Sequence, residues 1–348
     1  MGYTIISDPY RFTRSLSTSI TNMTQEILID AEHLYRFYGP NCAVQDVSFQ
    51  LAKGDVLGFL GPNGAGKSST MQMLTGNLAP SAGKIRVRGI DLLDAPKRAK
   101  HELGYLPEQP PLYREHTVDE FLTYCGHLHR VSGKDLRAAV DQAKQRCGLG
   151  AVGKRLIGNL SKGYQQRVGI AQAILHNPAV VILDEPTVGL DPIQIREIRA
   201  LIRELGNEHG IILSTHILPE VQGVCNRVQI INRGRLVFSD TMKGLERHLH
   251  SQHLIVRLRN MPVASELQQL PGIVAVETLD DGRLRLRYEG ASPAEALAET
   301  AVNKHWGLEE LIPERRTLEQ IFIELTMQDA HLDNPKAASA HPTETEAA

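Results

Sequence analysis

A glycine-rich segment, Gly61–Ser68, has the residue types and spacing of a phosphate-binding loop. It reads GPNGAGKS, which matches the pattern G-x-x-x-x-G-K-[ST]. The glycines let the backbone curl so that its N–H groups face phosphate oxygens, and a helix beginning there adds positive potential. Lys67 is expected to reach the β- and γ-phosphates, and the Ser68 hydroxyl to bind Mg²⁺. The segment thus predicts a nucleotide-phosphate site that includes Gly61, Pro62, Asn63, Gly64, Ala65, Gly66, Lys67, Ser68 and Ser69.

Two adjacent carboxylates, Asp184 and Glu185, follow the apolar run Val180–Leu183. A parallel strand delivers the residues at its carboxyl end to the ligand crevice. We expect Asp184 to hold Mg²⁺, largely through water, and Glu185, which points elsewhere, to act as a general base toward the attacking water. A solvated turn is the alternative for such a pair. The preceding apolar run and the upstream phosphate loop favour the catalytic interpretation.

These groups need strands and helices to position them. A 3.6-residue period indicates a helix over Thr117–His129, and Thr117 with Glu120 forms a capping box. A second helix is expected over Lys67–Leu74. Short apolar runs predict strands over 55–60, 103–106, 180–183 and 211–213. Strands alternating with helices indicate an α/β fold with a parallel sheet.

The segment Leu160–Arg167 reads LSKGYQQR and begins another predicted helix, with Ser161 as its N-cap. It resembles the LSGGQ signature of ATP-binding cassette (ABC) ATPases, with Lys162 in place of a glycine and Tyr164 in place of a glutamine. Such variants resemble those of export-type ABC ATPases, including gliding-motility ones. The resemblance implies a P-loop NTPase fold with a helical subdomain. It also implies that Ser161 and Gly163 contact ATP held by an opposite subunit.

Further positions follow the order of the same family. Tyr38 resembles the aromatic residue that stacks on adenine, although a core aromatic at a strand end is the alternative. Asp191 closes a D-loop, which contacts the opposite subunit, and His216 matches the switch histidine that senses the γ-phosphate. The family usually has a glutamine near Mg²⁺ after the strand at 103–106. Here Glu108 takes that position with Gln109 beside it, and either residue is a candidate.

The composition changes along the chain and suggests its organisation. Residues 1–25 read as a disordered leader, in which Met23 is an alternative start. Residues 26–247 carry the ABC motifs, with a helical subdomain at about 112–175. Residues 250–326 are expected to form a small α+β domain of the split β-α-β type, similar to the accessory domain of some export-type ABC ATPases. Residues 328–348 are rich in Ala, Thr, Pro and Glu and read as a disordered tail.

The order β-α-β-β-α-β underlies the expectation for the accessory domain. Arg283, Arg285 and Arg287 would share one face of a strand, either as a solvated face or as a contact for a partner or lipid head group. Its expected strands are 254–258, 273–276 and 283–288, and its helical segments are 263–270, 293–305 and 317–325.

Composition excludes several classes of protein. The chain has 348 residues, 42% of them hydrophobic, and a formal net charge of −2, so it gives no global electrostatic case for nucleic-acid binding. Its 4 cysteines show no C-x-x-C spacing, which indicates a reducing compartment. No stretch approaches the roughly 20 apolar residues of a membrane span. We therefore expect a cytoplasmic protein with no nucleic-acid partner.

The resemblance also implies a mechanism. One P-loop and one signature per chain predict a homodimer around two ATP–Mg²⁺, in which hydrolysis separates the subunits. The dimer would lie on the cytoplasmic face of the membrane and drive a separate integral-membrane permease, in the outward direction. A soluble ABC protein acting on ribosomes or DNA is one alternative, and an ATP-dependent regulator is another. A GTPase is disfavoured because no N-K-x-D motif is present.

Overall fold

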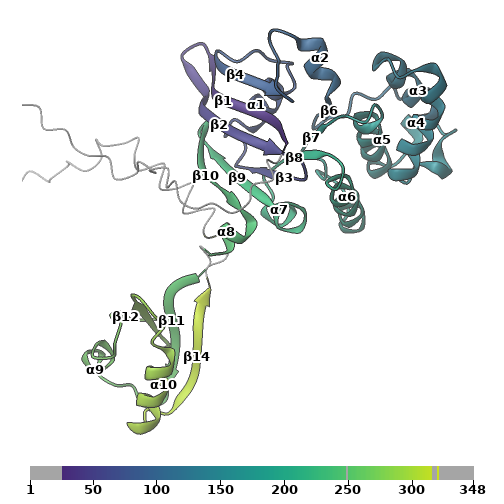
Figure 1. The fold of residues 1–348 in the computed structure, drawn as a ribbon. Helices are drawn as coiled ribbons and strands as arrows, with labels where there is room; N and C mark the ends of the chain where they lie inside the picture. Colours follow the sequence, from purple (N-terminus) through teal and green to yellow (C-terminus); the bar gives the residue numbers. More distant parts are fainter. Residues whose placement is uncertain (1–25, 248–249, 316–319, 321–348) are drawn as a thin grey trace, which may run out of the picture.

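The computed structural model describes residues 26–247, 250–315 and 320 (Figure 1). The expected leader (1–25) and tail (328–348) lie outside the described residues. The helix expected over 317–325 does so as well, apart from Gln320.

A six-stranded sheet forms the centre of the larger part of the chain. Its strands β9, β3, β8, β7 and β6 are parallel neighbours, and β10 adds an antiparallel edge. Every residue of β3, β7 and β8 is buried, as expected for strands covered on both faces. In sheet order the strands are β10 (Arg235–Thr241), β9 (Arg227–Asn232), β3 (Val56–Leu60), β8 (Gly210–Thr215), β7 (Val180–Asp184) and β6 (Leu103–Leu106).

An antiparallel sheet and helix α1 (Lys67–Leu74) cover one face of this central sheet (Figure 1). Leu57 and Phe59 of β3 point into this core, whereas Val56 and Leu60 join the core on the opposite face. The alternation follows from the two-residue period of a strand. The strands of the antiparallel sheet, in order, are β2 (Asn41–Ala52), β1 (Ile27–Tyr38), β4 (Ala82–Val87) and β5 (Ile90–Asp91).

Helices contribute the core on the opposite face. The predicted helix at Thr117–His129 is α3, and its capping box is present, since Glu120 N–H donates to the Thr117 side chain and Thr117 N–H donates to the Glu120 carboxylate. None of the described helices is both long enough and apolar enough to cross a bilayer. The helices between β5 and β11 are α2 (Pro96–His101), α3 (Val118–Leu128), α4 (Gly133–Arg146), α5 (Lys162–Ile174), α6 (Pro192–Leu205), α7 (Leu218–Val224) and α8 (Met242–Arg247), with 3₁₀ turns at Gly150–Val152 and Ile157–Asn159.

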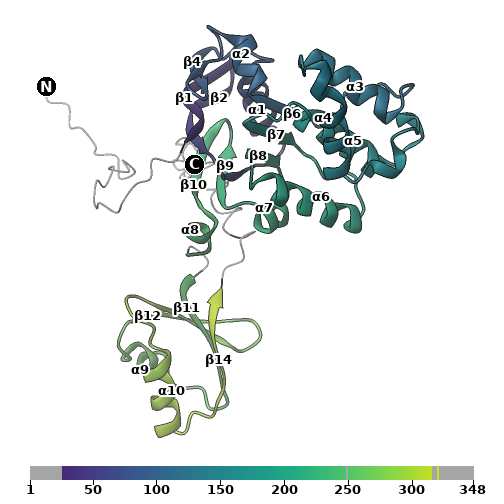
Figure 2. The ribbon, with the colours of Figure 1, turned by 45° about the vertical axis from the view of Figure 1, so that its right-hand side comes forward.

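A third sheet, antiparallel and in the order β12-β13-β11-β14, has its own hydrophobic core (Figure 2). Leu267, Leu297 and Trp306 pack against its inner face. The chain follows the order β-α-β-β-α-β, although the first strand is longer than the alternating run 254–258. The elements are β11 (His250–Leu258), α9 (Ala264–Gln268), β12 (Ile273–Thr278), β13 (Leu284–Tyr288), α10 (Ala294–Asn303) and β14 (Leu308–Arg315).

Ion pairs occupy two of the three arginines predicted to share a strand face; Arg285 and Arg287 lie in β13, and Arg283 directly precedes it. Arg283 contacts Asp281 at 2.7 Å, and Arg285 contacts Glu314 at 2.9 Å and Glu277 at 3.2 Å. These arginine head groups are therefore engaged by carboxylates of the sheet and of the turn before β13, which favours the solvated-face interpretation over a contact with lipid.

The parallel register brings the functional segments to one edge of the central sheet. Leu60, the last residue of β3, pairs with Thr215 of β8, and Asp184, the last residue of β7, pairs with Ser214. The segments at the ends of β3, β7 and β8 therefore emerge side by side, and they carry the predicted phosphate loop, the carboxylate pair and His216.

Candidate nucleotide-binding site

The phosphate loop connects β3 to α1, and its glycines are required by the backbone. Gly66 is the N-cap of α1 with φ of 104°, and a Cβ there would lie 2.5 Å from the Ala43 carbonyl oxygen. Gly64 also has a positive φ, of 79°. L-residues with a side chain rarely adopt such angles. The loop therefore curls tightly at the helix start, where unpaired backbone N–H groups can bind an anion.

Lys67 is 6% exposed, and its ammonium lies inside the curl of the loop. Nζ donates hydrogen bonds to the carbonyl oxygens of Gly61, at 2.8 Å, and Pro62, at 3.2 Å. It lies 3.7 Å from Oε1 of Glu185. Burial lowers the pKa of Lys67, while the carboxylates of Glu185 and Asp184 oppose that shift. The Lys67 ammonium thus has two carbonyl acceptors, those of Gly61 and Pro62, and a nearby carboxylate, that of Glu185.

Asp184 ends β7 and is 4% exposed. Its Oδ1 is buried and has no hydrogen-bond partner among the described residues. Burial raises the pKa of Asp184, and the nearby Glu185 and Glu108 add to that effect. A buried carboxylate oxygen that lacks a donor fits a divalent cation, because Mg²⁺ prefers oxygen ligands and commonly binds one or two carboxylates together with phosphates and water. The carboxylate oxygen at this position is therefore a suitable ligand for Mg²⁺.

Glu185 turns away from Asp184 because its φ is +48°. Its N–H donates to the Ser214 carbonyl oxygen at 2.8 Å, which fixes this unfavourable conformation against β8. The carboxylate contacts Nδ1 of His216 at 2.9 and 3.0 Å. Because a carboxylate only accepts, Nδ1 carries the proton in this contact. The side chain is 8% exposed, so its charge is poorly screened.

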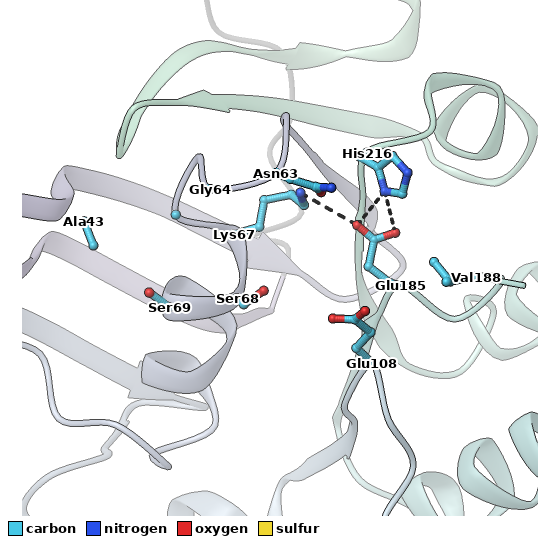
Figure 3. Close-up of a pocket in the computed structure, with 11 residues that line it drawn as sticks. Ala43, Asn63, Gly64, Lys67, Ser68, Ser69, Glu108, Glu185, Val188 and His216 are labelled. Carbon is cyan, nitrogen blue, oxygen red and sulfur yellow. Dashed lines mark hydrogen bonds and ion pairs between the residues drawn. The ribbon is translucent and has the colours of Figure 1, made fainter.

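A pocket of about 330 Å³ opens beside these groups (Figure 3). In the close-up, Glu185 lies between Lys67 and His216, and Glu108 lies below it. Glu108 lines the pocket, whereas Gln109 is not one of its lining residues. Sequence reasoning missed one lining residue, Ala43, and named Val188 only as the start of the D-loop segment Val188–Asp191. The lining residues are Ala43, Asn63, Gly64, Gly66, Lys67, Ser68, Ser69, Glu108, Glu185, Val188 and His216.

Tyr38 lies at the end of β1 and is 46% exposed, so it is not the core aromatic of the alternative interpretation. Its hydroxyl is 3.4 Å from the Ser69 hydroxyl, which places the ring near the pocket. The Arg36 guanidinium carbon stands 4.8 Å from the ring centroid. Cation–π contact occupies one face of the ring.

The predicted signature residues Ser161 and Gly163, and Asp191 of the D-loop, do not line this pocket. Ser161 caps α5 by accepting from Tyr164 N–H, and Asp191 caps α6 by accepting from the N–H groups of Ile193 and Gln194 at 2.9 Å. A Cβ on Gly163 would lie 2.6 Å from the Gln194 side chain. Within the described residues, the two helix starts therefore pack against each other, apart from the phosphate loop of the same chain.

A family model and curated relatives both match this chain. The family model described as "ABC transporter" matches residues 44–188. The bacitracin transport ATP-binding protein BcrA of Bacillus licheniformis is 38% identical over 212 residues, which are 60% of this chain and 68% of BcrA. The uncharacterized ABC transporter ATP-binding protein YxlF of Bacillus subtilis is 29% identical over 298 residues, 86% of this chain and 99% of YxlF.

Among solved structures, cbiO1 from Clostridium perfringens, described as part of the transporter complex cbiONQ, has a TM-score of 0.58 and 28% identity, covering 65% of this chain and 95% of that chain. The likeness extends over the P-loop NTPase fold seen in the two sheets and their helices. Family model, relatives and site geometry agree, and the chain belongs to the ATP-binding subunits of ABC transporters, which hydrolyse ATP to power transport.

Proposed function

We propose that two copies of this chain clamp two ATP–Mg²⁺ between them, with the phosphate loop of one copy opposite the signature of the other. The observation that carries the proposal is the composition of the pocket. It contains Lys67, Glu185 and His216, but its lining among the described residues includes neither Ser161 nor Gly163. One copy therefore offers half of the expected contacts to the γ-phosphate, and the second copy would supply the other half from the start of α5.

The phosphates take the place of the carbonyl partners of Lys67. On binding, the ammonium exchanges the oxygens of Gly61 and Pro62 for those of the β- and γ-phosphates, which are stronger, charged acceptors. Ser68 and Asp184 would hold Mg²⁺, which neutralises charge on the phosphate oxygens.

Glu185 then accepts a proton from the attacking water, while His216 holds the carboxylate in place through Nδ1–H; in the imidazolium form, its Nε2–H would also donate to the γ-phosphate. Glu108, which lines the pocket, is the candidate for the position where the family usually has a glutamine. Its charge would lie beside the cation, and Gln109 remains the alternative only if that loop moves.

The adenine base would stack on Tyr38. Arg36 covers one face of the ring, and the exposed remainder of the side chain is available to the base. Stacking on an aromatic ring is tolerant of base identity, because every base has a π-face. This contact is therefore expected to add affinity without strong discrimination between ATP and GTP.

An integral-membrane permease would be the partner, bound to the segment around 112–150 on the cytoplasmic face of the membrane. Three large side chains in this segment are exposed, namely Tyr113 at 44%, Tyr124 at 40% and Leu128 at 63%. Exposed apolar groups of this size on one helical region suit a protein contact. The resemblance of the signature variant to those of export-type ABC ATPases favours outward transport.

We further propose that residues 26–247 form the ABC domain, with about 112–175 as its helical subdomain, and that 250–326 form an accessory domain. The separate hydrophobic core of the third sheet supports this division.

Replacing the proposed base tests the catalytic assignment. Glu185→Gln should lower the steady-state ATPase rate by at least about 10²-fold, because general-base catalysis contributes roughly 10²–10⁴-fold. ATP affinity should be kept, since the shape of the side chain is kept. Glu204→Gln is the matched control, because it makes the same chemical change at a side chain that is 58% exposed. Turnover of Glu185→Gln at the control's rate would remove Glu185 as the base.

A further inference from the structure

A carboxylate outside the predicted site is buried beneath it. Glu220 lies on α7, four residues after His216, and is 1% exposed. It occupies the apolar face of the helix together with Leu218 and Val221. Burying a carboxylate is costly unless hydrogen bonds compensate. The partners of Glu220 therefore indicate what it does.

Two buried threonine hydroxyls donate to this carboxylate. The Thr187 hydroxyl donates to Oε1, and the Thr215 hydroxyl donates to Oε2 at 2.7 Å. Thr187 is two residues after Glu185, at the start of the D-loop, and Thr215 directly precedes His216. The carboxylate thus ties together the segment that carries the base and the segment that carries the switch histidine.

The Thr215 hydroxyl has two possible acceptors but a single proton. Its oxygen is 2.7 Å from Oε2 of Glu220 and 3.4 Å from Oε2 of Glu185, and it also accepts from Ile217 N–H at 3.1 Å. The shorter distance assigns the proton to Glu220. The Thr215 hydroxyl therefore anchors the start of the switch segment to Glu220, and His216 Nδ1 is the near hydrogen-bond donor to Glu185.

We propose that Glu220 is a positioning residue for ATP hydrolysis, which holds the D-loop and switch segments in register through Thr187 and Thr215. The proposal rests on the proposed role of Glu185 as the base. It adds a residue that does not line the described pocket, and it links the segment that carries the base to the segment that carries His216.

Substitution by glutamine removes one of the two acceptors. Whichever way the amide is turned, its NH₂ group donates, so one threonine hydroxyl must direct its proton elsewhere. For Thr215 the next acceptor is Glu185. Glu220→Gln should therefore lower kcat by about tenfold or more, since small misalignments of catalytic groups have effects of this size. KM and equilibrium ATP affinity should stay within about twofold.

Substitution of Thr215 provides a second test, which changes the buried site less than substitution of Glu220 does. Thr215→Val removes the hydroxyl but keeps the shape of the side chain, and should lower kcat to a similar extent, whereas Thr215→Ser keeps the hydroxyl and should restore most of the rate. The double variant Glu220→Gln/Thr215→Val should be no slower than the slower single variant, because both changes act through one contact.

The experiment measures kcat, KM, ATP affinity and the thermal unfolding midpoint for these variants, with Glu204→Gln as the surface control. Unchanged kcat in Thr215→Val, additive losses in the double variant, or equal losses with Thr215→Ser and Thr215→Val would each overturn the proposal. If Glu220→Gln fails to fold, the comparison of the two Thr215 variants decides. Full turnover in Glu185→Gln would instead refute the base itself, so the two failures are distinguishable.

Discussion

Removing the buried ammonium of Lys67 should weaken ATP binding more than it destabilises the fold. In the structure, Nζ of Lys67 donates to two backbone carbonyls and lies 3.7 Å from Glu185, and burial lowers the pKa of Lys67. The cost of burying this cation offsets part of what its partners contribute. Lys67→Ala therefore removes a favourable and an unfavourable contribution together, and the change in unfolding free energy should be small.

For ATP binding, no such unfavourable contribution offsets the loss of the Lys67 ammonium. A hydrogen bond to a charged group contributes about 1.5–3 kcal/mol, and Lys67 is positioned to make at least one with a phosphate. A loss of about 2–3 kcal/mol corresponds to roughly 30- to 150-fold weaker binding. Titration calorimetry with ATP and Mg²⁺ measures this directly, and Lys97→Ala, at an exposed position of α2, is the matched control. Equal ATP affinity in Lys67→Ala and the control would refute the phosphate-loop assignment.

Three further results are expected. Gly66→Ala should lower stability to chemical denaturation by about 2 kcal/mol, since its φ of 104° is costly for an L-residue and the new Cβ would lie 2.5 Å from a carbonyl oxygen; a wild-type denaturation curve would contradict this. A chain ending at residue 247 should still bind ATP if the domain division is right, and its failure to fold would argue against the boundary. Burial lowers the pKa of His176 to about 3, so the unfolded chain binds a proton that the native one does not, and stability falls as pH drops below about 6.5. The loss from pH 7 to pH 5 should be about 2 kcal/mol, and it should shrink in His176→Gln.

Local sequence signals located the elements that carry the site. Helix α1 begins at Lys67 because the glycine before it permits the turn, and the apolar runs of β3, β7 and β8 are strands buried on both faces. The capping box of α3 is equally local. In each case the residues that decide the structure are within a few positions of one another, so the sequence alone suffices.

Contacts between distant segments were not predictable in this way. Ala43 reaches the phosphate loop from β2, and nothing in its side chain distinguishes it from any other alanine in a strand. Glu220 gave a weak signal, as a carboxylate on the apolar face of a short helix. Its partners Thr187 and Thr215 are 33 and 5 residues away, and only the register of β7 and β8 brings them together. Likewise, Glu108 and Gln109 are equivalent in sequence, whereas the structure turns Glu108 to the pocket.

The most direct test of the central claim is the mass of Glu185→Gln in solution with and without ATP. Sedimentation velocity should give the 38.5 kDa chain without nucleotide and a species of about twice that mass with ATP–Mg²⁺, because the two half-sites can then close without turnover. Addition of Ser161→Arg should abolish the heavier species, since it places a large side chain at the start of α5. A Glu185→Gln chain that keeps the monomer mass at saturating ATP would contradict the account.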